Sequence, residues 1–314
     1  MPVEESTHLS AKNLTKVIGA RTIVDDVSFD VYGGEVFGFL GPNGAGKTTT
    51  IRMLVGLIEP TEGRVEICGY DIRREFEDAM RCVGCIVEMP DLYRFMTGRE
   101  NLEHFARMLR IRSSGFGVRG SGGEIERVAA LVNMEHRLDQ RVGTYSLGMR
   151  QRLGVAQAML GSPRLLILDE PANGLDPAGI REIRELLRGL ATEEKMAVFV
   201  SSHLLAEIEL MCDRVAIIHK GRLLRTGSVS DLISAEREME LRVGDVARAL
   251  SIVREQGFEA RSDGDCVFVM IDERQTPPVI AALAQNGVEV FHARRRMQTL
   301  EEMFIEATGG ETVG

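Results

Sequence analysis

The sequence contains no apolar run that approaches the length of a membrane span, and its first residues, MPVEESTHLS, lack the features of a signal peptide. It also lacks an excess of positive charge, because 38 lysines and arginines stand against 47 acidic residues, for a net charge of −9. No broad basic surface is available for a phosphate backbone, which argues against nucleic acid as a partner. We therefore expect a cytoplasmic protein, with any membrane role exerted through a partner.

Cysteine is scarce and dispersed. The five residues are Cys68, Cys82, Cys85, Cys212 and Cys266. Cys82 and Cys85 form a C-x-x-C pattern, which suits redox chemistry or half of a metal site. They lie in a strand-like apolar run without a second ligand pair nearby, so we expect buried, reduced thiols that act as small hydrophobic side chains.

The most informative stretch is GPNGAGKTTT, residues 41–50, which lies between a predicted buried strand and a predicted helix. Its spacing G-x-x-x-x-G-K-T is that of a phosphate-binding loop. We expect Gly41, Gly44 and Gly46 to adopt backbone conformations closed to other residues, so that consecutive N–H groups converge on phosphate oxygens. The N-terminus of the following helix turns its positive dipole end toward the same anion.

Two side chains extend this phosphate site. Lys47 is expected to reach the β- and γ-phosphates of a nucleoside triphosphate, and the Thr48 hydroxyl is placed to ligate Mg²⁺. The loop residues assigned to the nucleotide are Gly41, Pro42, Asn43, Gly44, Ala45, Gly46, Lys47, Thr48 and Thr49.

Polar residues follow two further apolar runs, 165–168 and 196–200, which are typical of strands covered on both faces. An open α/β sheet binds ligands beyond the carboxyl ends of its strands, so these residues are expected near the phosphate loop. Asp169 is suited to the water shell of the metal, and Glu170 to activation of the attacking water. His203 places an imidazole at the end of the second strand.

From about residue 91 to residue 160 the apolar pattern is helical. Within it, the segment 113–123, SSGFGVRGSGG, is predicted to be a flexible surface loop and a tolerated insertion. The segment 145–153, YSLGMRQRL, opens a helix whose Ser146 and following amides are suited to bind a phosphate. Taken alone, this segment is equally compatible with an ordinary capped helix.

The pattern of apolar and polar residues changes after Gly227. Strand and helix patterns between residues 238 and 292 follow the order βαββαβ, which suggests a small ferredoxin-like domain. The three arginines at 294–296 are interpreted as a solvated edge, with contact to a partner or to lipid headgroups as the alternative. We place one domain at 1–230 and a second, α+β accessory domain at 236–308.

Taken in order, the phosphate loop, YSLGM, LLILDEP, ANGLDP and SSH resemble the ATP-binding subunits of ATP-binding-cassette (ABC) transporters over about residues 8–230. The resemblance implies a P-loop NTPase of the α/β class. Such a cassette has a mainly parallel sheet, an antiparallel β subdomain and a helical subdomain, here at about 91–160.

The same resemblance implies individual roles. Glu88 occupies the position of a glutamine that contributes to the metal site, and Ser146 and Gly148 belong to the family signature. Asp176 lies in the loop between subunits, and His203 is the γ-phosphate switch. Lys47 and Glu170 join His203 as the implied catalytic residues.

In this family two subunits enclose two ATP molecules, each held between the phosphate loop of one chain and the signature of the other. The resemblance thus implies ATP and Mg²⁺ as cofactors and a second cassette as partner, with a homodimer expected. It further implies an integral membrane permease encoded separately, which holds the subunit peripherally on the inner face of the cell membrane.

Three departures from the family pattern are visible. The signature usually reads LSGGQ, whereas this chain has YSLGM at 145–149. The position that commonly stacks an aromatic ring on adenine is Ile18, in LTKVIG, which leaves only apolar contact. Glu88 replaces the usual glutamine.

The segment EMPDLYRFMTGRENL, the YSLGM signature and the pattern TLEEMF at 299–304 are similar to the branch that serves exporters of peptide antibiotics, other drugs, lipids or ions. We therefore expect an ATPase subunit of an exporter. The alternatives are a soluble ABC ATPase that acts on nucleic acid or ribosomes, an importer subunit, and a nucleotide-binding regulator without turnover. A single cassette without sustained heptads disfavours the first alternative, and an intact Glu170 and His203 disfavour the last.

Overall fold

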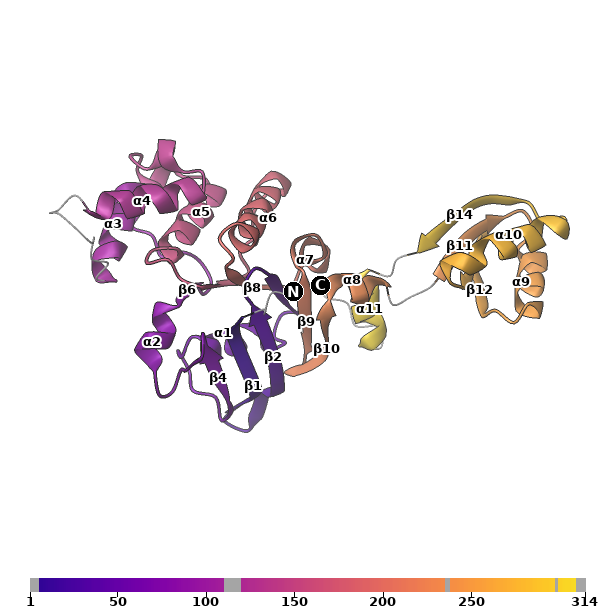
Figure 1. Cartoon of the computed structure of the whole chain (residues 1–314), viewed down its shortest axis with the longest axis horizontal. Helices are drawn as coiled ribbons and strands as arrows, with labels where there is room; N and C mark the ends of the chain where they lie inside the picture. The colour runs from indigo at the N-terminus through magenta and orange to yellow at the C-terminus, as the bar shows by residue number, and fades with distance from the viewer. Residues whose placement is uncertain (1–5, 110–119, 235–237, 297–298, 309–314) are drawn as a thin grey trace. The chain divides into compact units, whose positions relative to one another are not determined.

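The computed structural model describes residues 6–109, 120–234, 238–296 and 299–308 (Figure 1). The chain divides into two compact units. The first comprises Met1–Ser228 with Phe304–Gly314, and the second comprises Val229–Met303. Among the residues described, no helix combines the length and the apolar character that crossing a membrane would require.

The centre of the first unit is a six-stranded sheet in the order β10-β9-β3-β8-β7-β6. Its strands are β3 (Val36–Leu40), β6 (Val83–Ile86), β7 (Leu165–Asp169), β8 (Ala197–Ser202), β9 (Arg214–His219) and β10 (Arg222–Ser228). All neighbours pair in parallel except β9 and β10. Every residue of β3, β7 and β8 is buried, as the continuous apolar runs predicted.

A second, antiparallel sheet in the order β2-β1-β4-β5 packs against the first. It is formed by β1 (Thr7–Ile18), β2 (Arg21–Tyr32), β4 (Glu62–Ile67) and β5 (Tyr70–Asp71). The ring of Phe29 on β2 lies 5.5 Å from Phe37, 5.3 Å from Phe39 and 5.8 Å from Phe199 between centroids. These four rings join the two sheets into one hydrophobic core, which includes Ala45 of the phosphate loop.

The structure describes seven α-helices between residues 47 and 211. They are α1 (Lys47–Leu54), α2 (Phe76–Arg81), α3 (Gly98–Met108), α4 (Gly120–Leu131), α5 (Leu147–Ala158), α6 (Pro177–Thr192) and α7 (Leu205–Met211). Helices α3, α4 and α5 contact one another and form the predicted helical region (Figure 1). Thr97 and Glu100 form a reciprocal capping box that fixes the start of α3.

Two local predictions are corrected. The segment 113–123 was predicted to be a loop, but α4 begins at Gly120, because Ile125, Val128 and Ala129 bury one side of the helix. The remainder of that prediction, residues 113–119, lies outside the described residues. The sequence pattern of residues 71–81 also predicts a helix, but α2 begins only at Phe76, since Tyr70 and Asp71 pair with β4.

The second unit contains α8 (Val229–Ser234), β11 (Glu238–Val243), α9 (Val246–Glu255), β12 (Ala260–Asp263), β13 (Cys266–Met270), α10 (Thr276–Gln285) and β14 (Val290–Arg296). The sheet order β12-β13-β11-β14, with all pairs antiparallel, gives the predicted ferredoxin-like arrangement. Leu241, Val253 and Leu283 are buried between the sheet and the two helices. The last helix, α11 (Leu300–Ala307), lies at the junction of the two units in the sequence.

The three arginines of β14 are not simply a solvated edge. Arg294 Nε lies 2.7 Å from a carboxylate oxygen of Glu240, and Arg296 lies 3.7 Å from Glu238. Glu238 also accepts two hydrogen bonds from Arg261, and it is almost fully buried. Arg294 and Arg296 therefore pair with carboxylates of β11.

Candidate nucleotide site

The phosphate loop joins β3 to α1, and its glycines serve two different purposes. Gly44 and Gly46 have φ values of 79° and 108°, in the region that other residues rarely adopt. Gly41 does not, so the expectation for that residue is corrected: it is confined by contact, because a Cβ there would lie 2.3 Å from the carbonyl oxygen of Ile218. Gly46 caps α1 without a side chain, which leaves the first amides of the helix facing the loop.

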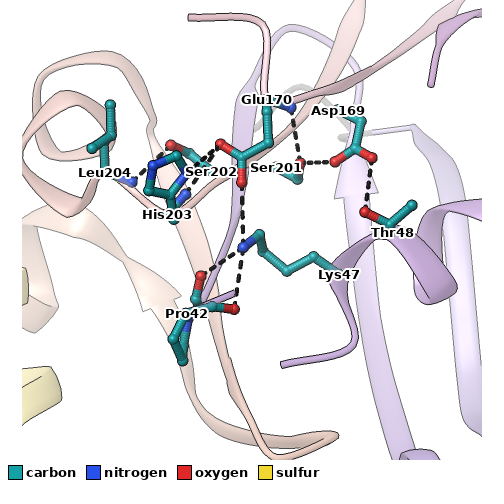
Figure 2. A network of polar contacts seen from close by, with 10 residues as sticks. Pro42, Lys47, Thr48, Asp169, Glu170, Ser201, Ser202, His203 and Leu204 are labelled. Atoms are coloured by element: carbon teal, nitrogen blue, oxygen red, sulfur yellow. Dashed lines mark hydrogen bonds and ion pairs between the residues drawn. The ribbon is translucent and has the colours of Figure 1, made fainter. Parts of the chain in front are cut away.

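Lys47 lies deep in this loop, and only 6% of the residue is exposed. Its Nζ donates hydrogen bonds to the carbonyl oxygens of Gly41 at 2.7 Å and Pro42 at 3.3 Å (Figure 2). The same ammonium lies 3.3 Å from Glu170 Oε1. The lysine charge is thus held at the loop by three oxygens, where it is available to a phosphate.

The carboxyl ends of β7 and β8 bring the two acidic residues and His203 together, as predicted from the strand pattern (Figure 2). Asp169 Oδ2 accepts a hydrogen bond from Thr48 Oγ1 at 3.0 Å, and Asp169 Oδ1 accepts one from Ser201. Glu170 Oε2 lies 2.8 Å from Nδ1 of His203 and accepts the backbone N–H of that residue at 3.3 Å. Glu170 has a φ of 50°, so its backbone is held in a conformation that costs energy for a residue with a side chain.

This arrangement has the chemistry that nucleotide hydrolysis needs. The Thr48 hydroxyl and the Asp169 carboxylate, 3.0 Å apart, are hard oxygen donors of the kind that Mg²⁺ prefers, so the residues present fit this ion. Glu170 contacts an ammonium on one side and an imidazole on the other, which holds its carboxylate in one place. The hollow beside them is lined by Ile23, Asn43, Gly44, Gly46, Lys47, Thr48, Thr49 and Glu170.

The predicted signature and intersubunit residues lie at a second hollow. Ser146 caps α5, its Oγ accepting the N–H of Met149 at 3.2 Å, and Asp176 caps α6 by accepting the N–H of Gly179 at 2.9 Å. Together with Gly148 they line one pocket, which shares no lining residue with the phosphate-loop hollow. The structure therefore brings the predicted residues together in two groups within one chain.

Two predicted residues lie elsewhere. The carboxylate of Glu88, 65% exposed, forms an ion pair of 2.8 Å with Arg52, and no contact with Thr48 or Asp169 occurs among the described side chains. Ile18 is 55% exposed and is not among the described residues that line the phosphate-loop hollow. Ile23 of β2 does line it. The sequence analysis missed Ile23, and its apolar side chain beside Thr22 and Val24 carried no motif that would have singled it out.

The cysteines are free thiols in different surroundings. The expectation of burial is wrong for Cys85, which is exposed because β6 is the edge strand of the sheet. Cys212 is buried, and burial raises the pKa of its thiol above the ordinary value. Burial, with Cys82 nearby, raises the pKa of Cys68 to about 12. Thiols with such pKa values stay protonated and poorly reactive at neutral pH.

Known proteins share this combination of loop, acidic pair and helical region. The family model described as "ABC transporter" matches residues 24–173, which include the phosphate loop and the acidic pair. An ABC transporter ATP-binding protein of Bacillus subtilis, YhcH, is 47% identical over 304 residues, which is 96% of each chain. The chain belongs to the ATP-binding subunits of ABC transporters. It therefore binds ATP and hydrolyses it.

Two further comparisons place this ABC subunit within the family. The bacitracin transport ATP-binding protein BcrA of Bacillus licheniformis is 39% identical over 314 residues, covering 98% of this chain and 100% of BcrA. A solved structure of an ATP binding subunit of an ABC transporter matches with a TM-score of 0.61 and 33% identity. That match covers 72% of this chain and 92% of the solved one. The fold class predicted for the cassette is confirmed.

Proposed function

We propose that this ABC subunit hydrolyses ATP to drive export of a drug, an antibiotic peptide, a lipid or an ion through a permease carried on a separate chain. The observation that carries the proposal is similarity to a bacitracin transport subunit over 98% of this chain, well beyond the cassette. The division into a cassette at 1–230 and an accessory domain at 236–308 belongs to the same proposal.

Five residues of the phosphate loop and of the ends of β7 and β8 have roles in this proposal. Lys47 binds the β- and γ-phosphates, and Thr48 and Asp169 hold Mg²⁺, which when bound offsets charge on the phosphates. Glu170 accepts a proton from the attacking water. His203, whose Nδ1 lies 2.8 Å from Glu170, contacts the γ-phosphate and orients that carboxylate.

The second hollow is assigned to the ATP of a second copy of this chain. Its backbone amides at the start of α5, beside Ser146 and Gly148, face a phosphate of the nucleotide bound by the other subunit. Asp176, in the loop before α6, contacts that subunit. A homodimer then contains two complete ATP sites, whereas a single chain contains one half of each site.

Membrane extraction tests the exporter assignment against the alternative of a soluble ATPase that acts on nucleic acid or ribosomes. We expect the full chain, tagged and expressed in its own host, to sediment with membranes and to purify in mild detergent with a multi-span protein. An alkaline wash should release it, since the attachment is peripheral. Recovery with ribosomes or nucleic acid, and none with membranes, would contradict the proposal.

Base selectivity is expected to be poor. Neither Ile18 nor Ile23 offers a ring to stack on adenine, and apolar contact discriminates weakly between purines. We expect kcat/KM for GTP to lie within about 10-fold of that for ATP. Phosphate release measured with both nucleotides checks this. Strict rejection of GTP would show that a polar group recognises the base.

The Glu88 assignment is tested by magnesium titration. A carboxylate brings full charge to a hard cation, and when Mg²⁺ is present we expect this attraction to exceed repulsion from Asp169 and Glu170. We therefore expect Glu88→Gln to need more Mg²⁺ for half-maximal hydrolysis while it retains most of its maximal rate. Glu88→Ala and wild type complete the series. Three superimposable curves would leave Glu88 only as the ion-pair partner of Arg52.

A further inference from the structure

Ser201 lies between the two acidic residues and has no role in the chemistry described so far. It is the next-to-last residue of β8, and it pairs in register with Asp169 of the parallel neighbour β7. Its exposed fraction is 0%, so it does not reach the hollow that receives ATP. Any effect of Ser201 on hydrolysis must act through its neighbours.

The hydroxyl of Ser201 contacts both acidic residues (Figure 2). Ser201 Oγ donates a hydrogen bond to Asp169 Oδ1 and accepts one from the backbone N–H of Glu170 at 3.1 Å. The carbonyl oxygen of Ser201 lies 3.2 Å from the same N–H. One buried hydroxyl thus donates a hydrogen bond to Asp169 and accepts one from Glu170.

The hydrogen bond from Ser201 gives the two carboxylate oxygens of Asp169 different partners. Oδ1 is taken by Ser201, which turns Oδ2 toward Thr48, 3.0 Å away. Without the Ser201 hydroxyl, the carboxylate is free to rotate about its terminal torsion, because that torsion is broad. Groups that hold a metal-ligating carboxylate by hydrogen bonds tune both metal affinity and orientation.

The hydrogen bonds from the backbone N–H of Glu170 to Ser201 stabilise an unfavourable backbone conformation at Glu170. Glu170 has a φ of 50°, which a side-chain-bearing residue adopts only when its surroundings over-determine it. The two Ser201 oxygens that accept its N–H provide such a restraint. This conformation directs the Glu170 side chain toward His203 and Lys47.

We propose that Ser201 is a positioning residue that sets the orientation of Asp169 toward the metal and of Glu170 toward the attacking water. The proposal rests on the roles assigned above to Asp169 and Glu170. Ser201 itself touches neither ATP nor the ion. The hydroxyl of Ser201, and not the volume of its side chain, sets the orientation of the two carboxylates.

A comparison of Ser201→Thr with Ser201→Val isolates that hydroxyl, because the two side chains have nearly the same shape and both suit a strand. We expect kcat of the valine variant to be about 10-fold below that of the threonine variant, with KM for ATP within about twofold. The valine variant should also need about 10-fold more Mg²⁺ for half-maximal hydrolysis. Calorimetry of ADP binding with and without Mg²⁺ gives a readout without turnover, and we expect the Mg²⁺-dependent gain in affinity to shrink only in the valine variant.

Ser10→Ala is the matched control for loss of a buried serine–aspartate bond. Ser10 Oγ donates to Asp30 Oδ1 at 2.6 Å, in the antiparallel sheet, and its removal should leave kcat and the Mg²⁺ curve unchanged. If either β-branched variant fails to fold, Ser201→Ala compared with Ser10→Ala makes the same test without added volume.

Equal kcat and equal Mg²⁺ curves for the threonine and valine variants would overturn the positioning role. Glu170→Gln in the same assay separates this failure from failure of the proposed function. If Glu170→Gln is inactive while the Ser201 pair is equal, only the inference about Ser201 falls. If Glu170→Gln turns over normally, the assignment of the general base falls first.

Discussion

Glu170→Gln is expected to lower ATP turnover by about 10²-fold or more, because a positioned general base contributes on that scale. Glutamine keeps the shape of the side chain and one oxygen for the neighbouring ammonium or imidazole, but it does not take a proton from water. The carboxylate it replaces lies 3.3 Å from Lys47 and 2.8 Å from His203, so little rearrangement is needed. Steady-state phosphate release, together with equilibrium binding of a fluorescent ATP analogue, separates the lost turnover from binding, which should remain intact.

Glu77→Gln supplies the control for this variant. Glu77 is an exposed carboxylate on α2 whose partner is Arg81, so its loss removes the same charge away from the site. It should turn over ATP at the wild-type rate. Undiminished turnover in Glu170→Gln would remove Glu170 from the role of general base.

Lys47→Ala is expected to weaken nucleotide binding itself. In the proposed site the ammonium makes charge-assisted contacts with phosphates, each worth about 1.5–3 kcal/mol, so we expect ATP to bind about 10- to 100-fold more weakly. Because Lys47 is almost fully buried and also pairs with Glu170, the variant leaves that carboxylate without its cation. Calorimetric titration with ATP, at a Mg²⁺ concentration that saturates the wild type, measures the change.

Lys12→Ala is the matched control, since Lys12 is an exposed lysine of β1. Its affinity for ATP should equal that of the wild type. Equal affinity in Lys47→Ala would count against the assignment of residues 41–49 to the phosphates.

Residues that belong to a local pattern could be placed from the sequence. The phosphate loop carries its own spacing, and the apolar strands β7 and β8 deliver Asp169, Glu170 and His203 to one edge because parallel strands end together. The order of strands and helices predicted for the second unit, βαββαβ, also followed from its sequence pattern. Its sheet order is that of the ferredoxin-like fold.

Residues whose position depends on pairing between distant segments could not be placed in this way. Ser201 contacts Asp169 only through the register of β7 against β8, which no local pattern encodes. Cys85 is exposed because β6 is an edge strand, and an apolar run does not reveal whether its strand is central or at the edge. The pair between Glu88 and Arg52 depends on the approach of α1 to the end of β6.

Glycine-rich segments differ from their predicted structure for another reason. Residues 120–123 have poor helix propensity, yet they form the first turn of α4, since the buried face that follows outweighs local preference. At Gly41 the sequence identified the correct residue for the wrong cause, because contact with Ile218, and not a positive φ, excludes a side chain.

In the proposed homodimer, each ATP site is completed by a second copy of this chain. The most direct measurement is the mass of Glu170→Gln in solution, by light scattering coupled to size exclusion, with Mg²⁺ and ATP. Bound ATP that is not hydrolysed should hold two chains together, so we expect twice the mass of one chain with ATP and the mass of a single chain with ADP. The double variant Lys47→Ala, Glu170→Gln should have the mass of a single chain with either nucleotide. A single chain with ATP bound, or a double mass that does not depend on the nucleotide, would contradict an ATP site shared between two chains.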